Sequence, residues 1–181
     1  MRRNHVRIIG GDFKRRQIEF PDALGLRPTP DRVRETLFNW LGQDLAGLRC
    51  LDLFAGSGVL GFEALSRGAG RVVMVDSNPR VIGALRENAE RLGAARVELR
   101  CEDAVQFLAR EAGPFDVVFV DPPYGKGWVG RIMPLLPRQL STDAWVYVES
   151  EAPMDPMGGW EVRRQGRAGQ VHFHLLKRAP C

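Results

Sequence analysis

Apolar and polar positions follow two repeating patterns along most of this chain. From residue 49 onward, short apolar runs of strand length alternate with segments whose apolar positions have helical spacing. The predicted strands cover residues 50–54, 71–75, 96–100, 115–120, 144–149, 160–164 and 170–176. The predicted helices cover residues 59–67 and 128–136, with two more that begin at residues 78 and 103. This alternation predicts an α/β fold with a mostly parallel, doubly wound sheet. No helix fits between the last two strands, so we expect an antiparallel C-terminal hairpin at one edge.

The first thirty residues have a different character. Apolar and polar residues alternate over residues 6–9 and 17–20, with a turn at Gly10-Gly11 between them, which predicts a small β-hairpin. Residues 26–30 contain two prolines and must be irregular. Asp31 is expected to cap a helix that runs to about Leu41. We therefore divide the chain into an N-terminal β-hairpin extension, residues 1–30, and one α/β domain, residues 31–181.

The hairpin region is strongly basic. Net charge is +4, and the first sixteen residues carry six bases against one acid, Asp12. All but three of the 26 basic residues are Arg, which suits bidentate contacts to phosphate. A clustered basic arm indicates a nucleic-acid partner, although a solvated surface is the alternative. The predicted RNA-binding residues are Arg2, Arg3, Arg7, Lys14, Arg15 and Arg16, with Arg32 and Arg34 as weaker candidates.

Several classes of protein are disfavoured. No apolar run approaches the roughly 20 residues that span a bilayer, and the basic N-terminus lacks an apolar signal segment, so we expect no membrane contact. Three cysteines without a CxxC pair suggest a reducing, cytoplasmic location. His172 and His174 would share one face of a strand, but no third ligand is suggested, so no metal is expected.

A glycine-rich loop follows the first strand of the α/β pattern. Gly56-Ser57-Gly58-Val59-Leu60-Gly61 fits the G-x-G-x-x-G spacing between a strand and a helix. Asp76 lies 20 residues after Gly56, at the end of the second strand, where a carboxylate can accept hydrogen bonds from ribose hydroxyls. Sites for NAD and for S-adenosyl-L-methionine share this arrangement, so the motif predicts a nucleotide cofactor without distinguishing the two.

Asp52 favours one of these cofactors. It lies in the strand four residues before Gly56, where its charge would oppose the pyrophosphate of NAD and favour the sulfonium and ammonium of S-adenosyl-L-methionine. The alternative is that Asp52 only accepts hydrogen bonds from loop amides. Asp103 is expected to accept from the adenine amino group, to cap the next helix, or both. The predicted cofactor-binding residues are Asp52, Phe54, Ala55, Gly56, Ser57, Gly58, Asp76, Ser77, Asp103 and Ala104.

The sequence Asp121-Pro122-Pro123-Tyr124 directly follows the fourth strand and is the most specific signal in the chain. It lies at the carboxyl edge of the sheet, where open α/β folds bind ligands. The prolines fix the backbone and remove two N–H donors, which leaves a row of acceptors for the hydrogens of an exocyclic amine. Asp121 can take a proton as positive charge develops on that nitrogen, and Tyr124 can stack on an extruded base. We expect Asp121, Pro122, Pro123 and Tyr124 to be catalytic.

Five segments, taken together, resemble the RsmD-type methyltransferases, which modify guanine N2 in bacterial 16S ribosomal RNA. They are Arg7-Ile8-Ile9-Gly10-Gly11, Leu26-Arg27-Pro28-Thr29-Pro30-Asp31-Arg32-Val33-Arg34-Glu35, Leu37-Phe38-Asn39-Trp40-Leu41, Phe54-Ala55-Gly56-Ser57-Gly58 and Val120-Asp121-Pro122-Pro123. The resemblance covers nearly the whole chain and also includes Tyr147-Val148-Glu149, although we expect Glu149 to be structural.

This resemblance implies a class I methyltransferase Rossmann-like fold, with S-adenosyl-L-methionine at Gly56–Gly58 and Asp76. It also implies base chemistry at Asp121–Tyr124, with the base flipped into the site. The implied partner is 16S rRNA or a small ribosomal subunit that is still being assembled, and a monomer is expected. Asp76 stands where Glu is common and Tyr124 where Phe also occurs; neither change removes the expected role.

Three alternatives differ in the chemistry of the site. A DNA adenine- or cytosine-N-methyltransferase also uses DPPY, but about thirty spare residues are too few to read several base pairs in a major groove. An NAD-dependent oxidoreductase would share the glycine loop, but Asp52 and DPPY oppose it. An RNA-binding or assembly module with a relic fold would not need an intact DPPY sequence.

Overall fold

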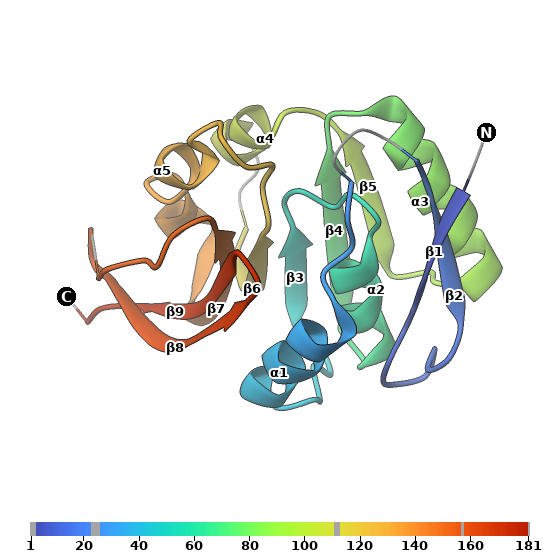
Figure 1. Ribbon diagram of the computed structural model, residues 1–181, viewed down its shortest axis with the longest axis horizontal. Coiled ribbons are helices and arrows are strands. Elements are labelled where there is room, and N and C mark those ends of the chain that lie inside the picture. Colours follow the sequence, from blue (N-terminus) through green and yellow to red (C-terminus); the bar gives the residue numbers. More distant parts are fainter. Residues whose placement is uncertain (1–2, 23–25, 111–112, 157, 181) are drawn as a thin grey trace.

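A seven-stranded sheet forms the centre of the molecule (Figure 1). The computed structural model describes residues 3–22, 26–110, 113–156 and 158–180. The strand order is β5-β4-β3-β6-β7-β9-β8. The strands are β3 (Arg49–Asp52), β4 (Arg71–Asp76), β5 (Val97–Cys101), β6 (Phe115–Val120), β7 (Leu140–Ser150), β8 (Trp160–Ala168) and β9 (Val171–Arg178).

Five neighbouring strands, β5 to β7 in this order, are parallel, and β9 pairs antiparallel with both β7 and β8. The mostly parallel sheet and the antiparallel C-terminal hairpin predicted from the sequence are therefore confirmed. Strand β9 inserts between β7 and β8, so β8 forms the outer edge. The helix predicted over residues 128–136 was too long: α5 (Trp128–Ile132) ends before Pro134, and a 3-10 helix, Leu136–Gln139, follows. Proline has no N–H and its ring crowds the preceding turn, which explains the break.

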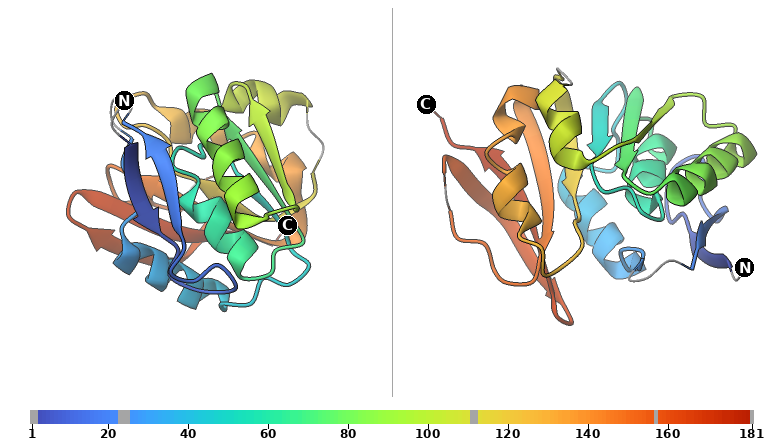
Figure 2. Two further views of the ribbon diagram at one scale, coloured as in Figure 1. Left: turned by 90° about the vertical axis from the view of Figure 1, so that its right-hand side faces the viewer. Right: turned by 90° about the horizontal axis from the view of Figure 1, so that it is seen from above.

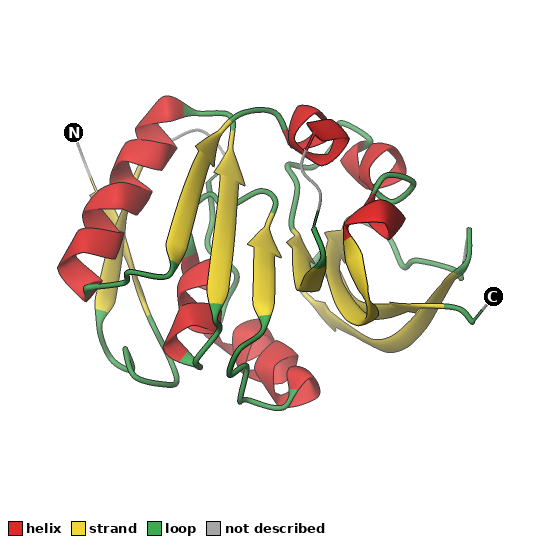
Figure 3. Cartoon of the chain, turned by 180° about the vertical axis from the view of Figure 1, so that it is seen from behind, coloured by secondary structure: helices red, strands yellow, loops and turns green. Residues whose placement is uncertain are grey.

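Helices cover both faces of the sheet, which Figures 1 and 3 show from opposite sides. One face packs against α1 (Asp31–Leu41), α2 (Val59–Ser66) and α3 (Pro79–Leu92), and the other against α4 (Ala104–Arg110) and α5. Successive strand residues point to opposite faces, so Cys50 and Met74 join the first core while Leu51 and Val75 join the second. This burial on both faces explains the nearly continuous apolar runs of the strands.

Two helix starts test the predicted caps. Asn78 caps α3 by accepting a 2.9 Å hydrogen bond from the Arg80 amide, with Pro79 at the first helical position, as predicted. The prediction that Asp31 caps α1 was wrong. Pro30 occupies the cap position, and Asp31 is the first helical residue, where its carboxylate accepts from the Arg34 guanidinium instead.

The N-terminal hairpin packs against α3 (Figure 2). Strands β1 (Arg3–Arg7) and β2 (Gln17–Pro21) pair antiparallel, as expected. The Asn88 side chain of α3 bonds the backbone of Glu19 in both directions, at 3.0 and 2.6 Å. Ile8 and Ile18 are fully buried and share the core of α1, α2 and α3. The extension is thus held firmly against the larger domain, and the boundary at residue 30 stays a prediction.

Candidate active site

The predicted cofactor and catalytic residues gather at one edge of the sheet. In the parallel register Asp52 pairs with Met74 of β4 and with Phe119 of β6, and Asp76 pairs with Cys101 of β5. The carboxyl ends of these four strands therefore lie side by side, at the upper edge of the sheet in Figure 1. The loops that follow them carry the glycine motif, Ser77, Asp103 and the DPPY sequence. Ligands bind at this edge in open α/β folds.

The glycine loop between β3 and α2 is a tight structure that only glycine can form. Gly56 and Gly58 have φ angles of 52° and 80°, in the left-handed region. A Cβ added to Gly58 would lie 2.3 Å from Leu85 Cδ2, so no side chain fits there. The Ala55 amide donates to the Val75 carbonyl at 2.8 Å, which ties the loop to β4. Ser57 and Ala55 are buried, and Gly56 stays partly exposed to a ligand.

Asp76 connects the end of β4 to this loop. Its Oδ2 accepts from the Gly56 amide at 3.1 Å, and its Oδ1 accepts from the Asn78 amide at 2.9 Å. Burial raises the pKa of Asp76, and the two amide donors partly oppose that rise. Ser77 is exposed beside it. A carboxylate oxygen has two lone pairs, so each oxygen of Asp76 can still accept from a ribose hydroxyl.

Asp103 caps the helix after β5. Its Oδ1 accepts from the Val105 amide at 2.8 Å and from the Gln106 amide at 3.2 Å, so the predicted capping role is confirmed. Ala104, the first residue of this helix, is buried. A role for Asp103 toward an adenine amino group stays a prediction.

Asp52 has a buried oxygen without a partner. The side chain is 1% exposed, and its Oδ2 accepts from the Gly61 amide at 3.1 Å. Its Oδ1 is fully buried and has no hydrogen-bond partner. Burial raises the pKa of Asp52 to about 7, and the nearby charges of Asp76 and Glu149 add to the rise. Such an oxygen is costly to bury alone, so it fits a site that receives a cationic ligand.

An aromatic pair lies between the glycine loop and the segment after DPPY. The Phe54 ring meets Trp128 edge to face, with centroids 5.2 Å apart. The Arg131 guanidinium lies 4.2 Å from the centroid of the Trp128 ring, and the buried Trp128 Nε1 has no partner. Trp128 was not among the predicted site residues. A tryptophan four residues after DPPY was the available signal.

The DPPY sequence leaves β6 as expected. Asp121 is largely buried, Pro122 is buried, and Pro123 is exposed. Tyr124 is 46% exposed and is the only large hydrophobic residue found exposed in the described part of the chain. An exposed aromatic ring beside a buried carboxyl group suits the stacking of a flat ligand.

A second carboxyl group meets Asp121 inside the molecule. Glu149 ends the buried part of β7, and its charge acts on Asp121. The Thr29 hydroxyl lies 2.9 Å from Glu149 Oε1 and 3.4 Å from Asp121 Oδ2. The Tyr147 hydroxyl donates to Glu149 Oε1 at 2.8 Å. Burial, together with the charge of Glu149, raises the pKa of Asp121 well above its usual value.

Sequence reasoning did not assign Thr29, Tyr147 or Glu149 to the site. Both Thr29 and Tyr147 are buried, and Thr29 belongs to the irregular segment before α1. That segment crosses the carboxyl edge of the sheet, since Leu26 Cδ1 would lie 3.3 Å from a Cβ on Gly56. The two prolines around Thr29 and the Tyr147-Val148-Glu149 segment were the signals available.

The predicted RNA-binding residues differ in their exposure and in their contacts with other protein groups. Lys14 and Arg15 are exposed in the turn of the hairpin, and Arg32 is exposed on α1. Arg3 forms ion pairs with Glu19 and Glu87, at 3.0 and 2.9 Å. Arg7 lies 3.9 Å from Asp31. Arg16 donates to the Arg91 and Leu92 carbonyls at the end of α3. Arg2 lies outside the described residues.

Arg34 is the clearest correction among these arginines. Its side chain has no exposed area, and its guanidinium donates to Glu63 at 2.6 Å, to the Thr29 carbonyl at 2.9 Å and to the Arg7 carbonyl at 2.8 Å. A group with these partners is not available to phosphate. Through these three partners Arg34 connects the N-terminal extension, the segment at Thr29 and helix α2, which contains Glu63. Glu63 also pairs with Arg67.

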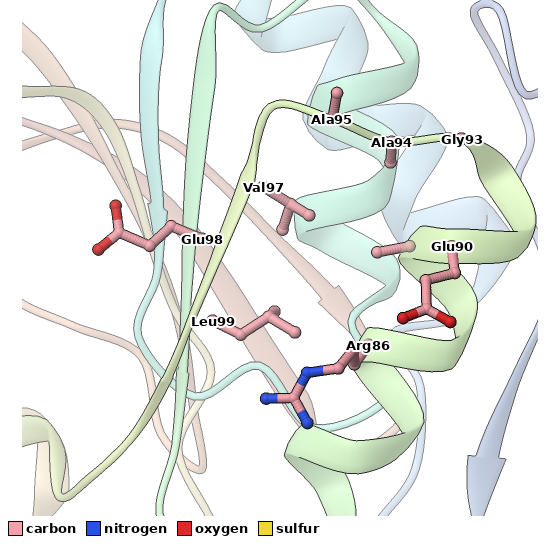
Figure 4. A pocket seen from close by; sticks show the side chains of 9 residues that line it. Arg86, Glu90, Gly93, Ala94, Ala95, Val97, Glu98 and Leu99 are labelled. Carbon is pink, nitrogen blue, oxygen red and sulfur yellow. The ribbon is translucent and has the colours of Figure 1, made fainter.

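A hollow of about 640 Å³ lies elsewhere, between α3 and the edge strand β5 (Figure 4). Val97 and Leu99 face α3 there, while Glu98 points to the other side of the strand. None of the residues that line it belongs to the predicted site.

In the described residues, no cluster of three or more His, Cys, Asp or Glu could hold a metal ion. Within the same residues, no helix is long and apolar enough to cross a membrane.

Comparisons with known proteins assign the family. The model of the family described as "Conserved hypothetical protein 95" matches residues 6–177. The chain is 42% identical over 179 residues to "Ribosomal RNA small subunit methyltransferase D" of Escherichia coli (strain K12), covering 96% of this chain and 90% of that protein. The solved structure of the Escherichia coli protein yhhF superposes with a TM-score of 0.88 at 41% identity, over 97% of this chain and 99% of that one.

A more distant structure shares the fold. The SAM-dependent methyltransferase from Agrobacterium tumefaciens has a TM-score of 0.66 at 21% identity, over 84% of this chain and 54% of that one. The fold is therefore that of the class I methyltransferases. This chain belongs to the RsmD family of methyltransferases.

Proposed function

We propose that this chain transfers a methyl group from S-adenosyl-L-methionine to the exocyclic N2 of a specific guanine in 16S ribosomal RNA. The observation that carries the proposal is the partly exposed Asp121-Pro122-Pro123-Tyr124 edge, which lies one strand away from the glycine loop. The name of the Escherichia coli relative supports ribosomal RNA of the small subunit as the substrate. The guanine N2 comes from the resemblance of the motifs.

The residues around the glycine loop fit S-adenosyl-L-methionine. The unpartnered Oδ1 of Asp52 would accept a hydrogen bond from the ammonium of the cofactor, and Asp76 would accept hydrogen bonds from the ribose hydroxyls. Gly56 and Gly58 offer backbone without side chains at close range. When bound, the cofactor supplies an electrophilic methyl group on a positively charged sulfur. An anionic edge of Asp52, Asp76 and Asp121 suits that charge.

The DPPY edge would prepare the amine. Asp121 would accept a hydrogen bond from the guanine amino group, and the prolines would leave backbone carbonyls as further acceptors. These contacts favour a nitrogen whose lone pair is available for in-line attack on the methyl group. Asp121 then takes the proton that the nitrogen loses after the N–C bond has formed. Tyr124, exposed beside Asp121, would stack on the base once it leaves its helix or loop.

The turn of the N-terminal hairpin would hold the RNA. Lys14 and Arg15 are exposed there without an ion pair among the described residues, and Arg32 is exposed on the neighbouring helix α1. Arg3, Arg7 and Arg16 contact the protein itself and would contribute mainly to the shape and field of this surface. Contacts to phosphate orient an RNA without reading its sequence. Arg34 is left out because it is buried.

The test is mass mapping of methylated nucleotides in ribosomal RNA from a deletion strain. We expect one guanine of 16S rRNA to lose its N2-methyl group, and the wild-type gene to restore it. The gene carrying Asp121→Asn serves as the matched control and should not restore it. Unchanged methylation in the deletion strain would refute the proposal. Methylation by the purified protein of a DNA adenine or cytosine, but not of rRNA, would favour the DNA enzyme instead.

A further inference from the structure

Two carboxyl groups meet at the catalytic edge, and only Asp121 has a role in the chemistry described so far. We infer that Glu149 is a positioning residue for methyl transfer: the Thr29 and Tyr147 hydroxyls hold its carboxylate against Asp121, where it strengthens Asp121 as the acceptor of the amine proton. This inference rests on the proposed function, which it deepens. It also gives a physical role to the N-terminal Arg-Pro-Thr segment and to the end of β7.

The contacts of Glu149 are those of a fixed anion. Its Oε1 accepts from Thr29 at 2.9 Å and from Tyr147 at 2.8 Å, and the side chain is 4% exposed. Two hydroxyl donors on one oxygen stabilise a buried negative charge. The Tyr147 hydroxyl stays protonated as a donor, because burial and the charge of Glu149 raise the pKa of Tyr147 well above its usual value.

Thr29 links the two acids. A hydroxyl group has one hydrogen, and the Thr29 oxygen lies nearer to Glu149, at 2.9 Å, than to Asp121, at 3.4 Å. The hydrogen therefore favours Glu149, so the negative charge is best held there and Asp121 is the member of the pair that gains and loses a proton. Two adjacent carboxylates resist simultaneous ionisation, which makes Asp121 more basic.

The charged groups that face this pair all raise the pKa of Asp121. Asp52 and Glu149 both raise the pKa of Asp121, as does burial, and the Thr29 hydrogen bond lowers it. Tyr124 and Glu151 lie on the solvent side, and Glu151 raises the pKa of Tyr124 without a comparable effect on Asp121. A proton acceptor works best when its pKa lies near the working pH, and an ordinary aspartate lies well below it.

The proton balance of the step is simple. The guanine nitrogen gives its electron pair to the methyl carbon, and the carbon–sulfur bond breaks with its electrons left on sulfur, which becomes a neutral thioether. The nitrogen, now positively charged, loses one hydrogen to ionised Asp121. The products are N2-methylguanine, S-adenosylhomocysteine and protonated Asp121, which returns its proton to solvent. Glu149 takes no part in the proton transfer itself and changes only how strongly Asp121 holds the proton.

The direct test follows the Asp121 carboxyl carbon by 13C NMR during a pH titration of the whole protein. The signal is assigned by its loss in Asp121→Asn. Glu149→Gln keeps the size of Glu149 and one acceptor oxygen for Thr29 and Tyr147, and it removes the charge, so the pKa of Asp121 should fall by about one unit or more. Glu151→Gln, which removes a charge two residues away, is the matched control and should leave that pKa unchanged. An Asp121 pKa that is the same in Glu149→Gln and in the wild type would overturn the inference.

A second variant covers the case in which Glu149→Gln does not fold. Tyr147→Phe keeps the ring of Tyr147 and removes the hydroxyl that donates to Glu149 Oε1. The Glu149 carboxylate is then held less firmly, so the pKa of Asp121 should fall, in the same direction as in Glu149→Gln. No shift of that pKa in Tyr147→Phe, or a shift to a higher value, would mean that the hydroxyl donors of Glu149 are only structural and would overturn the inference.

Kinetics connect the titration to the reaction. The acid limb of the kcat profile should move to lower pH in Glu149→Gln, with kcat about tenfold lower above that limb and KM for RNA unchanged. A wild-type profile in this variant would overturn the inference. Absence of methyl transfer to rRNA in the wild-type protein would instead refute the proposed function, while the NMR titration would still decide whether Glu149 controls Asp121.

Discussion

Asp52 predicts a pH dependence of cofactor binding. In the free protein, burial raises the pKa of its carboxyl group to about 7. An ammonium placed against the unpartnered Oδ1 would bind only the ionised form. Below pH 7, binding must therefore release a proton, and affinity must fall as the pH falls. At about pH 6 roughly one molecule in ten is ionised, so Kd should be about tenfold higher than at pH 8, which corresponds to about 1.4 kcal/mol.

Isothermal titration calorimetry with S-adenosyl-L-methionine between about pH 6 and pH 7.5 measures this dependence. In that range the α-amino group of the cofactor stays largely charged. Repeating the titration in two buffers of different ionisation enthalpy counts the protons released. Asp76 and Asp121 also have raised pKa values and contribute in the same direction. Asp52→Asn keeps an oxygen for the Gly61 amide and isolates the contribution of Asp52.

The variant should bind more weakly at pH 7.5 and lose most of the pH dependence. Without cofactor, the substitution should have the opposite effect and stabilise the folded protein at high pH. Because the folded-state pKa of Asp52 lies above its unfolded value, its ionisation costs stability as pH rises from about 4 through about 7. Asp52→Asn should therefore unfold at a higher temperature than the wild type at pH 8, with little difference near pH 4. A wild-type affinity that is constant over the range, or a variant that keeps the wild-type slope, would refute this account of Asp52.

Four further predictions concern other parts of the molecule. Asp76→Ala should weaken binding of S-adenosyl-L-methionine by about 1–3 kcal/mol, and equal calorimetric affinity would remove Asp76 from the site. Asp121→Asn should lower the single-turnover rate of methyl transfer about 10²-fold or more at saturating cofactor, while cofactor affinity stays near the wild-type value. Reversing the charges of Lys14 and Arg15 should flatten the salt dependence of RNA affinity by about 0.7 per lost phosphate contact, with cofactor affinity unchanged; an unaltered slope in the folded variant would place the RNA elsewhere. Arg34→Met should lower the free energy of unfolding by about 3 kcal/mol in urea titrations, because Glu63 loses a buried partner, whereas the exposed Arg32→Met should change it by less than about 0.5 kcal/mol.

The periodic pattern alone predicted most of the architecture. The strands of a sheet buried on both faces must be apolar throughout, and glycines must stand where the backbone turns with positive φ, as at Gly56 and Gly58. These requirements act on residues that are close together in the chain, so the sequence pattern alone predicts them. The alternation of strands and helices, the antiparallel C-terminal hairpin and the β1–β2 hairpin could be read from the sequence for this reason. The chemistry proposed for Asp121 and Tyr124 also comes from the sequence, because it depends on four adjacent residues.

The structure decided what depends on residues far apart in the chain. Arg34 was predicted to face RNA, but its charge is buried against Glu63, 29 residues away. Asp121 and Glu149 follow Thr29 by 92 and 120 positions in the chain, and both lie within hydrogen-bond distance of its hydroxyl group. The sequence does not distinguish an exposed arginine from a buried one. The partners of a carboxyl group are known only once the strands are paired in the folded sheet. Burial and pairing, which set the charge state of each group, arise from the packed fold and cannot be read from local order.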